Sequence, residues 1–167
     1  MDWQFDENSF IIPYTCIPLL LKEFKKSFVE ELSVARRQEI FNQYEIFVDS
    51  LKSIIGEVSF YQWIDGSFLN LYSFTNDLDI VTFLPEKTFK AVGKSLNILR
   101  YEMQSSLLDL YFVQALPSNH KNFFLYQSDR LYWLHLFSYS KRNLASGKRF
   151  EKGFFKLTLI REPRRKK

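Results

Sequence analysis

The hydrophobic pattern of the chain changes period once, at Gly56, and that change restricts the fold more than any other feature. Before it, between positions 19 and 55, apolar side chains recur every three or four residues, which is typical of amphipathic helices. After it, short runs rich in β-branched and aromatic residues stand between turn signals, which favours strands. We therefore expect a fold of the α/β (α+β) class.

The same pattern predicts where the elements lie. Residues 1–18 show no period and contain two prolines, so we expect an irregular N-terminal segment. A first helix should begin at Leu19, and a second should follow Ser33 as its N-cap and end at Gly56. Strands are expected over residues 58–64, 78–84, 106–113 and 154–160, and further helices over residues 86–99 and 128–139.

Composition excludes several classes of protein and site. The 167 residues are 46% hydrophobic and 25% charged, which suits one globular domain and rules out a wholly disordered chain. The single cysteine, Cys16, excludes an internal disulfide and a cysteine-based zinc site, and we expect it to be buried and unreactive. No apolar run is long enough to cross a membrane, and the N-terminus is acidic where a signal peptide would be basic. We expect a cytoplasmic protein with no membrane partner.

The positive charge of the chain is concentrated at its end. Residues 161–167 hold five Lys or Arg and one Glu, which accounts for the whole formal net charge of +4, so residues 1–160 are neutral. A basic tail can attract nucleic acid. A solvated chain end is the alternative interpretation.

Three features after Gly56 predict a site for phosphate chemistry. Gly66-Ser67 directly follows an expected strand, and a glycine there would let an anion approach free backbone N–H groups. Asp77 and Asp79 begin the next strand, where alternation places both carboxylates on one face. Asp109 lies within an apolar strand, where an acid needs a partner such as a metal ion. Such an oxygen-rich site suits Mg²⁺, and two ions would serve phosphoryl transfer.

The order of these motifs resembles the nucleotidyltransferases of the DNA polymerase β superfamily, above all its small bacterial members. The resemblance is carried by Trp-Ile-Asp-Gly-Ser-Phe-Leu-Asn at residues 63–70 and Thr-Asn-Asp-Leu-Asp-Ile-Val at residues 75–81. It implies a nucleotidyltransferase fold, with a short mixed β-sheet, helices mainly on one face and an N-terminal helical layer. A single domain would span residues 1–167, divided into the helical layer (1–56), a catalytic core (57–116), a C-terminal helix and strand (117–160) and the basic tail (161–167).

The resemblance also implies a role for each motif residue. Gly66 and Ser67 would hold the triphosphate. Two Mg²⁺ (or Mn²⁺) ions would be ligated by Asp77 and Asp79, and Asp109 would bind the ion that activates the acceptor hydroxyl. Asp65 would cap the Gly-Ser turn rather than catalyse.

The loop over residues 69–75 carries no Lys or Arg, where small relatives often place a basic residue. The triphosphate charge must then be met from the basic stretch before the last strand, although a solvated loop is the other interpretation of that stretch. Lys152 is the preferred nucleotide-binding residue, and the other candidates are Lys141, Arg142, Lys148 and Arg149.

These assignments imply Mg²⁺-dependent transfer of a nucleoside monophosphate from an NTP or dNTP to a hydroxyl of a nucleotide, an oligonucleotide, an RNA or a protein. Small relatives occur in bacterial toxin–antitoxin and antiphage defence modules, so a cognate partner protein encoded nearby is a further expectation. The alternatives are a non-catalytic nucleotide- or partner-binding module with a degenerate nucleotidyltransferase fold, a nucleic-acid adaptor that acts through its tail, and a structural subunit of a defence complex. The oligomeric state stays open.

Other residues have a structural interpretation that outweighs a functional one. Arg36-Arg37 could reach a phosphate, but exposed charge is the norm on helices, so we expect both side chains to be solvated. Trp63, Tyr132 and Trp133 could stack on a base, although core packing is favoured in a chain that is 18% aromatic. His135 is expected to be a hydrogen-bonded helix residue rather than a general base.

Overall fold

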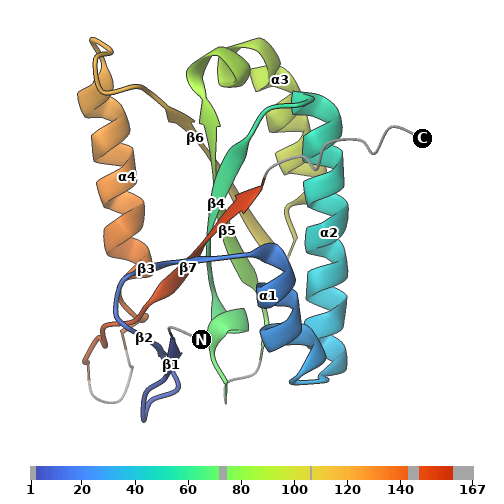
Figure 1. The fold of residues 1–167 in the computed structure, drawn as a ribbon, viewed down its shortest axis with the longest axis vertical. Helices are drawn as coiled ribbons and strands as arrows, with labels where there is room; N and C mark the ends of the chain where they lie inside the picture. Colours follow the sequence, from blue (N-terminus) through green and yellow to red (C-terminus); the bar gives the residue numbers. More distant parts are fainter. Residues whose placement is uncertain (1–2, 72–74, 106, 143–146, 160–167) are drawn as a thin grey trace.

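In a computed structural model the protein is built around a mixed β-sheet, and the structure describes residues 3–71, 75–105, 107–142 and 147–159. Over these ranges the main sheet has five strands in the order β3-β7-β4-β5-β6 (Figure 1). The pairs β3–β7 and β5–β6 are parallel, and the pairs β7–β4 and β4–β5 are antiparallel. The expected α/β class is therefore confirmed. The strands are β3 (Cys16–Leu19), β4 (Phe60–Asp65), β5 (Leu78–Pro85), β6 (Leu108–Ala115) and β7 (Phe154–Leu159).

The expectation of an irregular, extended segment over residues 1–18 was wrong in part, because the described residues of this segment include three short strands. Strands β1 (Gln4–Phe5) and β2 (Ile11–Ile12) pair as a short antiparallel ribbon, and β3 joins the main sheet beside β7. These strands are two to four residues long, so they show no sequence period. Among the expected strand ends, Ser106 and Ile160 lie outside the described residues, as does the basic tail over 161–167.

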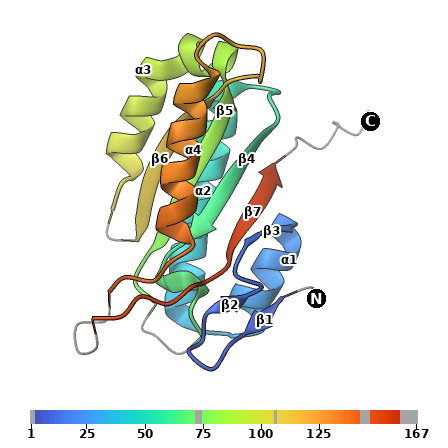
Figure 2. The ribbon, with the colours of Figure 1, turned by 90° about the vertical axis from the view of Figure 1, so that its left-hand side faces the viewer.

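Helices cover both faces of the sheet unequally. The helices α1 (Leu21–Lys25) and α2 (Ala35–Ile55), with the π-helical turn η1 (Lys26–Glu30) between them, lie on one side. Helix α3 (Glu86–Met103) packs against α2 and β6 on its way from β5 to the parallel strand β6. Helix α4 (Phe123–Phe137) lies on the opposite side, in front of the sheet in Figure 2.

Three helix starts differ from the expected ones. Helix α1 begins at Leu21 rather than Leu19, because Leu19 is the last residue of β3. Ser33 does not cap α2, because its φ of 47° turns the chain and its hydroxyl donates to the Glu30 carbonyl, so Val34 takes the N-cap position. Gly56 ends α2 with a positive φ of 70°, as expected. Helix α4 begins at Phe123 rather than Ser128, and its first turns include Tyr126, whose hydroxyl lies 2.9 Å from that of Tyr61 on β4.

The core between α2 and the sheet contains one buried polar chain. The Tyr44 hydroxyl donates to Gln62 Oε1 at 2.7 Å, and Gln62 Nε2 donates to Thr82 Oγ1 at 3.0 Å. All three side chains are buried, so these bonds tie α2, β4 and β5 together in one register. Within the described ranges, every helix is too short or too polar to cross a bilayer.

Candidate active site

Strand register places three carboxylates in a row at one end of the sheet. Asp65 of β4 pairs with Asp79 of β5, and Asp79 pairs in turn with Asp109 of β6. Directly paired residues point to the same face, and neighbouring strands are about 5 Å apart. Asp77 precedes Asp79 by two residues, so alternation adds a fourth acid to the same face. We call Asp65, Asp77, Asp79 and Asp109 the acidic row.

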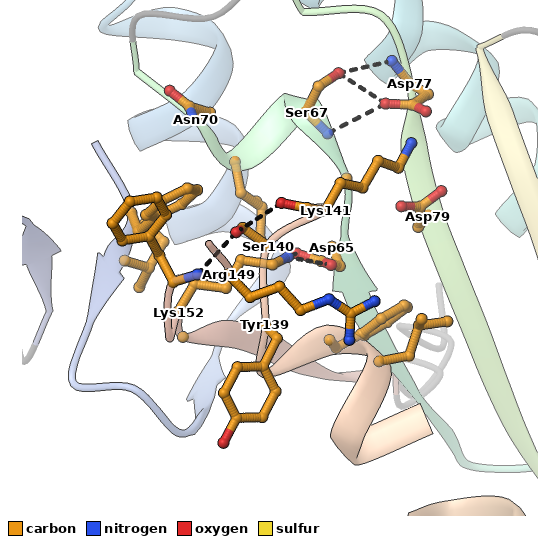
Figure 3. A pocket seen from close by; sticks show the side chains of 18 of the residues that line it. Asp65, Ser67, Asn70, Asp77, Asp79, Tyr139, Ser140, Lys141, Arg149 and Lys152 are labelled. Carbon is orange, nitrogen blue, oxygen red and sulfur yellow. Dashed lines mark hydrogen bonds and ion pairs between the residues drawn. The ribbon is translucent and has the colours of Figure 1, made fainter. Parts of the chain in front are cut away.

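The acidic row forms one wall of a cavity of about 670 Å³. The preferred site residues expected from the sequence all lie in its lining, and Figure 3 shows most of them converging on the same space. The opposite parts of the wall come from the segment before β2, from the C-terminal end of α4 and from the basic stretch before β7. The expected site residues in the lining are Gly66, Ser67, Asp77, Asp79, Asp109 and Lys152.

The first residues of β5 and the residue before them lie so close to position 66 that only a glycine fits there. The φ of Gly66 is +100°, and a Cβ atom there would lie 2.8 Å from the Asp77 carbonyl oxygen and 2.9 Å from the Asp79 nitrogen. The glycine therefore allows two segments of the protein to approach each other, whether or not a phosphate comes close. The turn opens only a three-residue 3-10 helix, η2 (Ser67–Leu69).

Ser67 is bonded to Asp77. Its backbone N–H and its hydroxyl both donate to Asp77 Oδ1, at 3.1 and 2.7 Å. Its hydroxyl oxygen accepts the backbone N–H groups of Asn76 and Asp77, at 2.8 and 3.1 Å. The Gly-Ser turn thus already holds one oxyanion, the carboxylate of Asp77.

Arg37 also supports this turn, so the expectation that it is solvated was wrong. Its side chain is only 2% exposed, and its guanidinium donates to the carbonyls of Phe68 at 2.5 Å and Asn70 at 2.7 Å. Burial lowers the pKa of the guanidinium. Arg36 lies on the exposed side of α2 and pairs with Glu39, as expected for a helix surface.

Lys152 is held by Asp65. Its ammonium contacts both oxygens of the Asp65 carboxylate, and the two side chains are 13% and 7% exposed. Burial raises the pKa of Asp65, and the ammonium of Lys152 acts in the opposite direction. Gly66 contributes a backbone hydrogen bond to the same carboxylate, so the expected capping role of Asp65 is one part of its function.

The backbone around Lys152 is fixed by its neighbours. The Lys152 N–H donates to the Ser138 carbonyl at 2.9 Å, and the Gly153 N–H donates to the Ile11 carbonyl at 2.7 Å. A Cβ atom at Gly153 would collide with the Pro13 carbonyl oxygen. Glycine is therefore needed where β7 passes the N-terminal ribbon, and this contact places Lys152 beneath the acidic row.

Asp79 lies at the centre of the acidic row. Within the described residues its side chain makes no hydrogen bond. Burial, followed by the charges of Asp65, Asp77 and Asp109, raises the pKa of Asp79 to about 7. The remaining acid, Asp109, accepts hydrogen bonds from Gln104 and Tyr111.

The donor set has the chemistry that Mg²⁺ takes. Magnesium is bound by a few carboxylate oxygens together with water and substrate phosphates, and a divalent cation would relieve the repulsion at Asp79. In the part of the chain that the structure describes, no group of three or more His, Cys, Asp or Glu side chains is arranged so that it could bind a metal ion. Three of the four carboxylates are instead bound by the protein donors Lys152, Ser67, Gln104 and Tyr111.

Two further cations face the acidic row. Lys141 and Arg149 line the cavity, whereas Arg142 and Lys148 lie outside its lining. Ser140 joins their two chain segments, because its N–H donates to the Phe150 carbonyl at 2.8 Å and its hydroxyl accepts the Phe150 N–H at 3.0 Å. Figure 3 shows the ammonium of Lys141 directed toward Asp77 and Asp79.

Trp63 and Trp133 pack in the core as expected, although Trp133 also lines the cavity, whereas the expectation of core packing was wrong for Tyr132. Trp63 and Trp133 are 2% and 9% exposed, and Trp133 packs on Tyr111 with ring centroids 4.3 Å apart. Tyr132 is 62% exposed and lies outside the cavity lining. Cys16 is half-buried on β3 rather than fully buried, and burial raises the pKa of its thiol to about 11.

Several residues that line the cavity, or that contact a member of the acidic row from outside it, are not predicted by sequence motifs. Asn8 and Phe10, which precede β2, lie in a segment expected to be irregular. Tyr111 follows Asp109 by two residues, so strand alternation is the signal that could have found it. Gln104 lies after α3 and carries no sequence signal that we can name.

The comparisons with known proteins give a family and no activity. The chain belongs to a family of unknown function, DUF6932, whose model matches residues 3–158. The comparison with curated proteins and the comparison with solved structures found no match.

The buried ion pair predicts a specific pattern of stability. Lys152→Met should lower the free energy of unfolding by about 3–5 kcal/mol, because it leaves the Asp65 charge buried without its partner. The double variant Asp65→Asn/Lys152→Met removes both charges and should recover most of this loss. Urea unfolding at pH 7 measures both, with Lys94→Met on the exposed side of α3 as the control. A double variant as unstable as the single one would contradict the electrostatic account.

The position of Asp79 predicts that the free energy of unfolding depends on pH. Its pKa is raised in the folded protein, so the folded state gains stability from this group in acid and loses it as the pH rises through about 7. Asp79→Asn removes that loss and should stabilise the protein by roughly 1–3 kcal/mol more at pH 8 than at pH 5. Thermal unfolding in EDTA at both values tests this, with the exposed Asp49→Asn as the control. Equal effects at the two values would contradict the repulsion.

Proposed function

We propose that the protein is a Mg²⁺-dependent nucleotidyltransferase that transfers a nucleoside monophosphate from an NTP or dNTP to a hydroxyl. The observation that carries the proposal is the meeting of the acidic row, the Gly66-Ser67 turn and two facing cations in one cavity. Carboxylates alone would suit many hydrolases. A turn that already binds an oxyanion through the N–H and hydroxyl of Ser67, beside such carboxylates, favours a substrate with several phosphates.

Each part of the cavity wall would have a separate task. Asp77, Asp79 and Asp109 would hold Mg²⁺ or Mn²⁺, and bound metal ions would stabilise the charge on the attacking and leaving oxygens. Ser67 would exchange the Asp77 carboxylate for a phosphate oxygen. Because catalysis of this kind depends on positioning and charge, no covalent intermediate with the protein is needed.

Lys141 and Arg149 are better placed than Lys152 to neutralise the triphosphate. Lys152 is engaged with Asp65, whereas the other two are exposed side chains on the cavity wall that faces the acidic row. A polyphosphate that lies between these two cations and the acidic row would contact the cations on one side and metal-bound carboxylates on the other. We therefore assign the nucleotide-binding role to Lys141 and Arg149 rather than to Lys152.

The size of the cavity limits the substrate. About 670 Å³ lies in the range of small-molecule sites, which suits a nucleotide. The acceptor hydroxyl, on a nucleotide, an RNA or a protein, would approach from outside. A cognate partner protein and a role in bacterial defence or a toxin–antitoxin pair belong to this proposal, as does a cytoplasmic location.

A non-catalytic nucleotide- or partner-binding module is the second candidate. It is favoured by the hydrogen bonds and the ion pair that bind Asp65, Asp77 and Asp109 to protein donors, since carboxylates satisfied in this way need no metal. Binding without pyrophosphate release would identify it.

A turnover assay tests the proposal. Purified protein with Mg²⁺ or Mn²⁺ is given each labelled NTP and dNTP, and products are read by mass spectrometry and denaturing gel. We expect pyrophosphate release that falls at least about 100-fold in Asp79→Asn, because that change removes a metal ligand and a charge from the centre of the site. The matched control is Asp129→Asn, an exposed acid on α4 outside the cavity lining. Turnover that survives in Asp79→Asn would contradict the proposal.

A further inference from the structure

We propose that Gln104 and Tyr111 are positioning residues that fix the orientation of the Asp109 carboxylate for the transfer reaction. This inference rests on the proposed function, because it assigns a task to Asp109 in that reaction. It concerns two side chains that the motif carrying the resemblance does not include.

Gln104 is locked by two hydrogen bonds of opposite sense. Its Oε1 accepts the backbone N–H of Leu110 at 2.9 Å, and its Nε2 donates to Asp109 Oδ1 at 2.6 Å. A backbone N–H can only donate, so it determines which end of the amide is oxygen and turns the amide nitrogen toward Asp109. The position of Gln104 is itself fixed, since it is the C-cap of α3 and its N–H donates to the Arg100 carbonyl.

Tyr111 holds the other oxygen of the same carboxylate. Its hydroxyl donates to Asp109 Oδ2 at 2.8 Å. The ring cannot turn freely, because Trp133 packs on it at a centroid distance of 4.3 Å and the Arg100 guanidinium lies 5.0 Å from its centre. Helices α3 and α4 thus both contribute to the placement of one phenol.

The two donors leave Asp109 in a defined orientation. Each carboxylate oxygen offers two lone pairs, so one on each oxygen stays available for a metal ion or an acceptor hydroxyl. Asp79, in contrast, makes no side-chain hydrogen bond among the described residues. Asp109 is on the edge strand β6. Without these donors an aspartate there would sample several rotamers, and ordering it would consume binding free energy.

Gln104 can be tested apart from substrate binding. It is exposed and lies outside the cavity lining, so its replacement removes no wall of the cavity. Gln104→Glu keeps the oxygen that accepts the Leu110 N–H and replaces the donor that faces Asp109 by a second carboxylate oxygen. The change is nearly isosteric, and it acts on the orientation and charge at Asp109.

The experiment compares Gln104→Glu, Gln104→Met and Tyr111→Phe with the wild-type protein. Thermal unfolding, Mn²⁺ affinity by electron paramagnetic resonance, and kcat and KM for pyrophosphate release are measured for each. The matched control is Gln127→Glu, the same change at an exposed position on α4. We expect Gln104→Glu, Gln104→Met and Tyr111→Phe each to lower kcat roughly 10–100-fold with KM for the nucleotide little changed, as removal of outer hydrogen bonds to metal ligands does. The Mn²⁺ affinity of Gln104→Met and Tyr111→Phe should fall in parallel.

Three results would overturn the inference. The first is an active wild-type protein whose kcat and Mn²⁺ affinity are unchanged in both Tyr111→Phe and Gln104→Met. The second is a loss of activity that follows the loss of thermal stability alone. The third is a nucleotide covalently attached to Tyr111, which would make the phenol an acceptor. A wild-type protein without turnover, but with Mn²⁺ affinity that Asp79→Asn abolishes and Tyr111→Phe weakens, would contradict the proposed function and leave the positioning of Asp109 supported.

Discussion

The buried ion pair between Lys152 and Asp65 is the interaction on which the rest of the site depends. Strand register brings Asp65, Asp79 and Asp109 to one end of β4, β5 and β6, and Asp77 lies two residues before Asp79. Burial and the neighbouring carboxylates raise the pKa of Asp79. Lys152 neutralises the most buried of the four. Its place is fixed by Gly153, which lets β7 pass against the N-terminal ribbon. A segment at the start of the chain therefore holds a side chain of the candidate site in place.

The candidate site combines parts that hydrogen bonds fix with one part that a bound phosphate would displace. Asp109, held by Gln104 and Tyr111, and the loop after Ser67, held by Arg37, are fixed by hydrogen bonds from α3, β6 and α2. Asp77 is different, because it occupies the donors of Ser67 that a phosphate would need. If the proposed function holds, a nucleotide phosphate would displace Asp77 from Ser67 toward a metal ion, so that metal and nucleotide would bind cooperatively.

The class of the fold, the central strands and every member of the acidic row except Asp65 could be predicted from the sequence, because local alternation and a Gly-Ser turn are short-range signals. Prediction failed where pairing between distant segments of the chain determines the structure. β3 forms beside β7, more than a hundred residues away along the chain. The role of Lys152 also depended on a partner from another strand, and Arg37 was expected to be solvated although the loop after Ser67 buries it. Gln104 contacts Asp109 only because α3 ends beside β6.

The proposed function requires Asp77, Asp79 and Asp109 together to hold a divalent metal beside a nucleotide. The most direct measurement is a crystal structure of the wild-type protein with MnCl₂ and a non-hydrolysable NTP analogue, read by anomalous scattering. We predict a manganese peak among these three carboxylates, with Asp77 turned away from Ser67 and a phosphate oxygen in its place. A structure in which nucleotide binds while Asp77 stays on Ser67, and no manganese lies at the acidic row, would contradict the account.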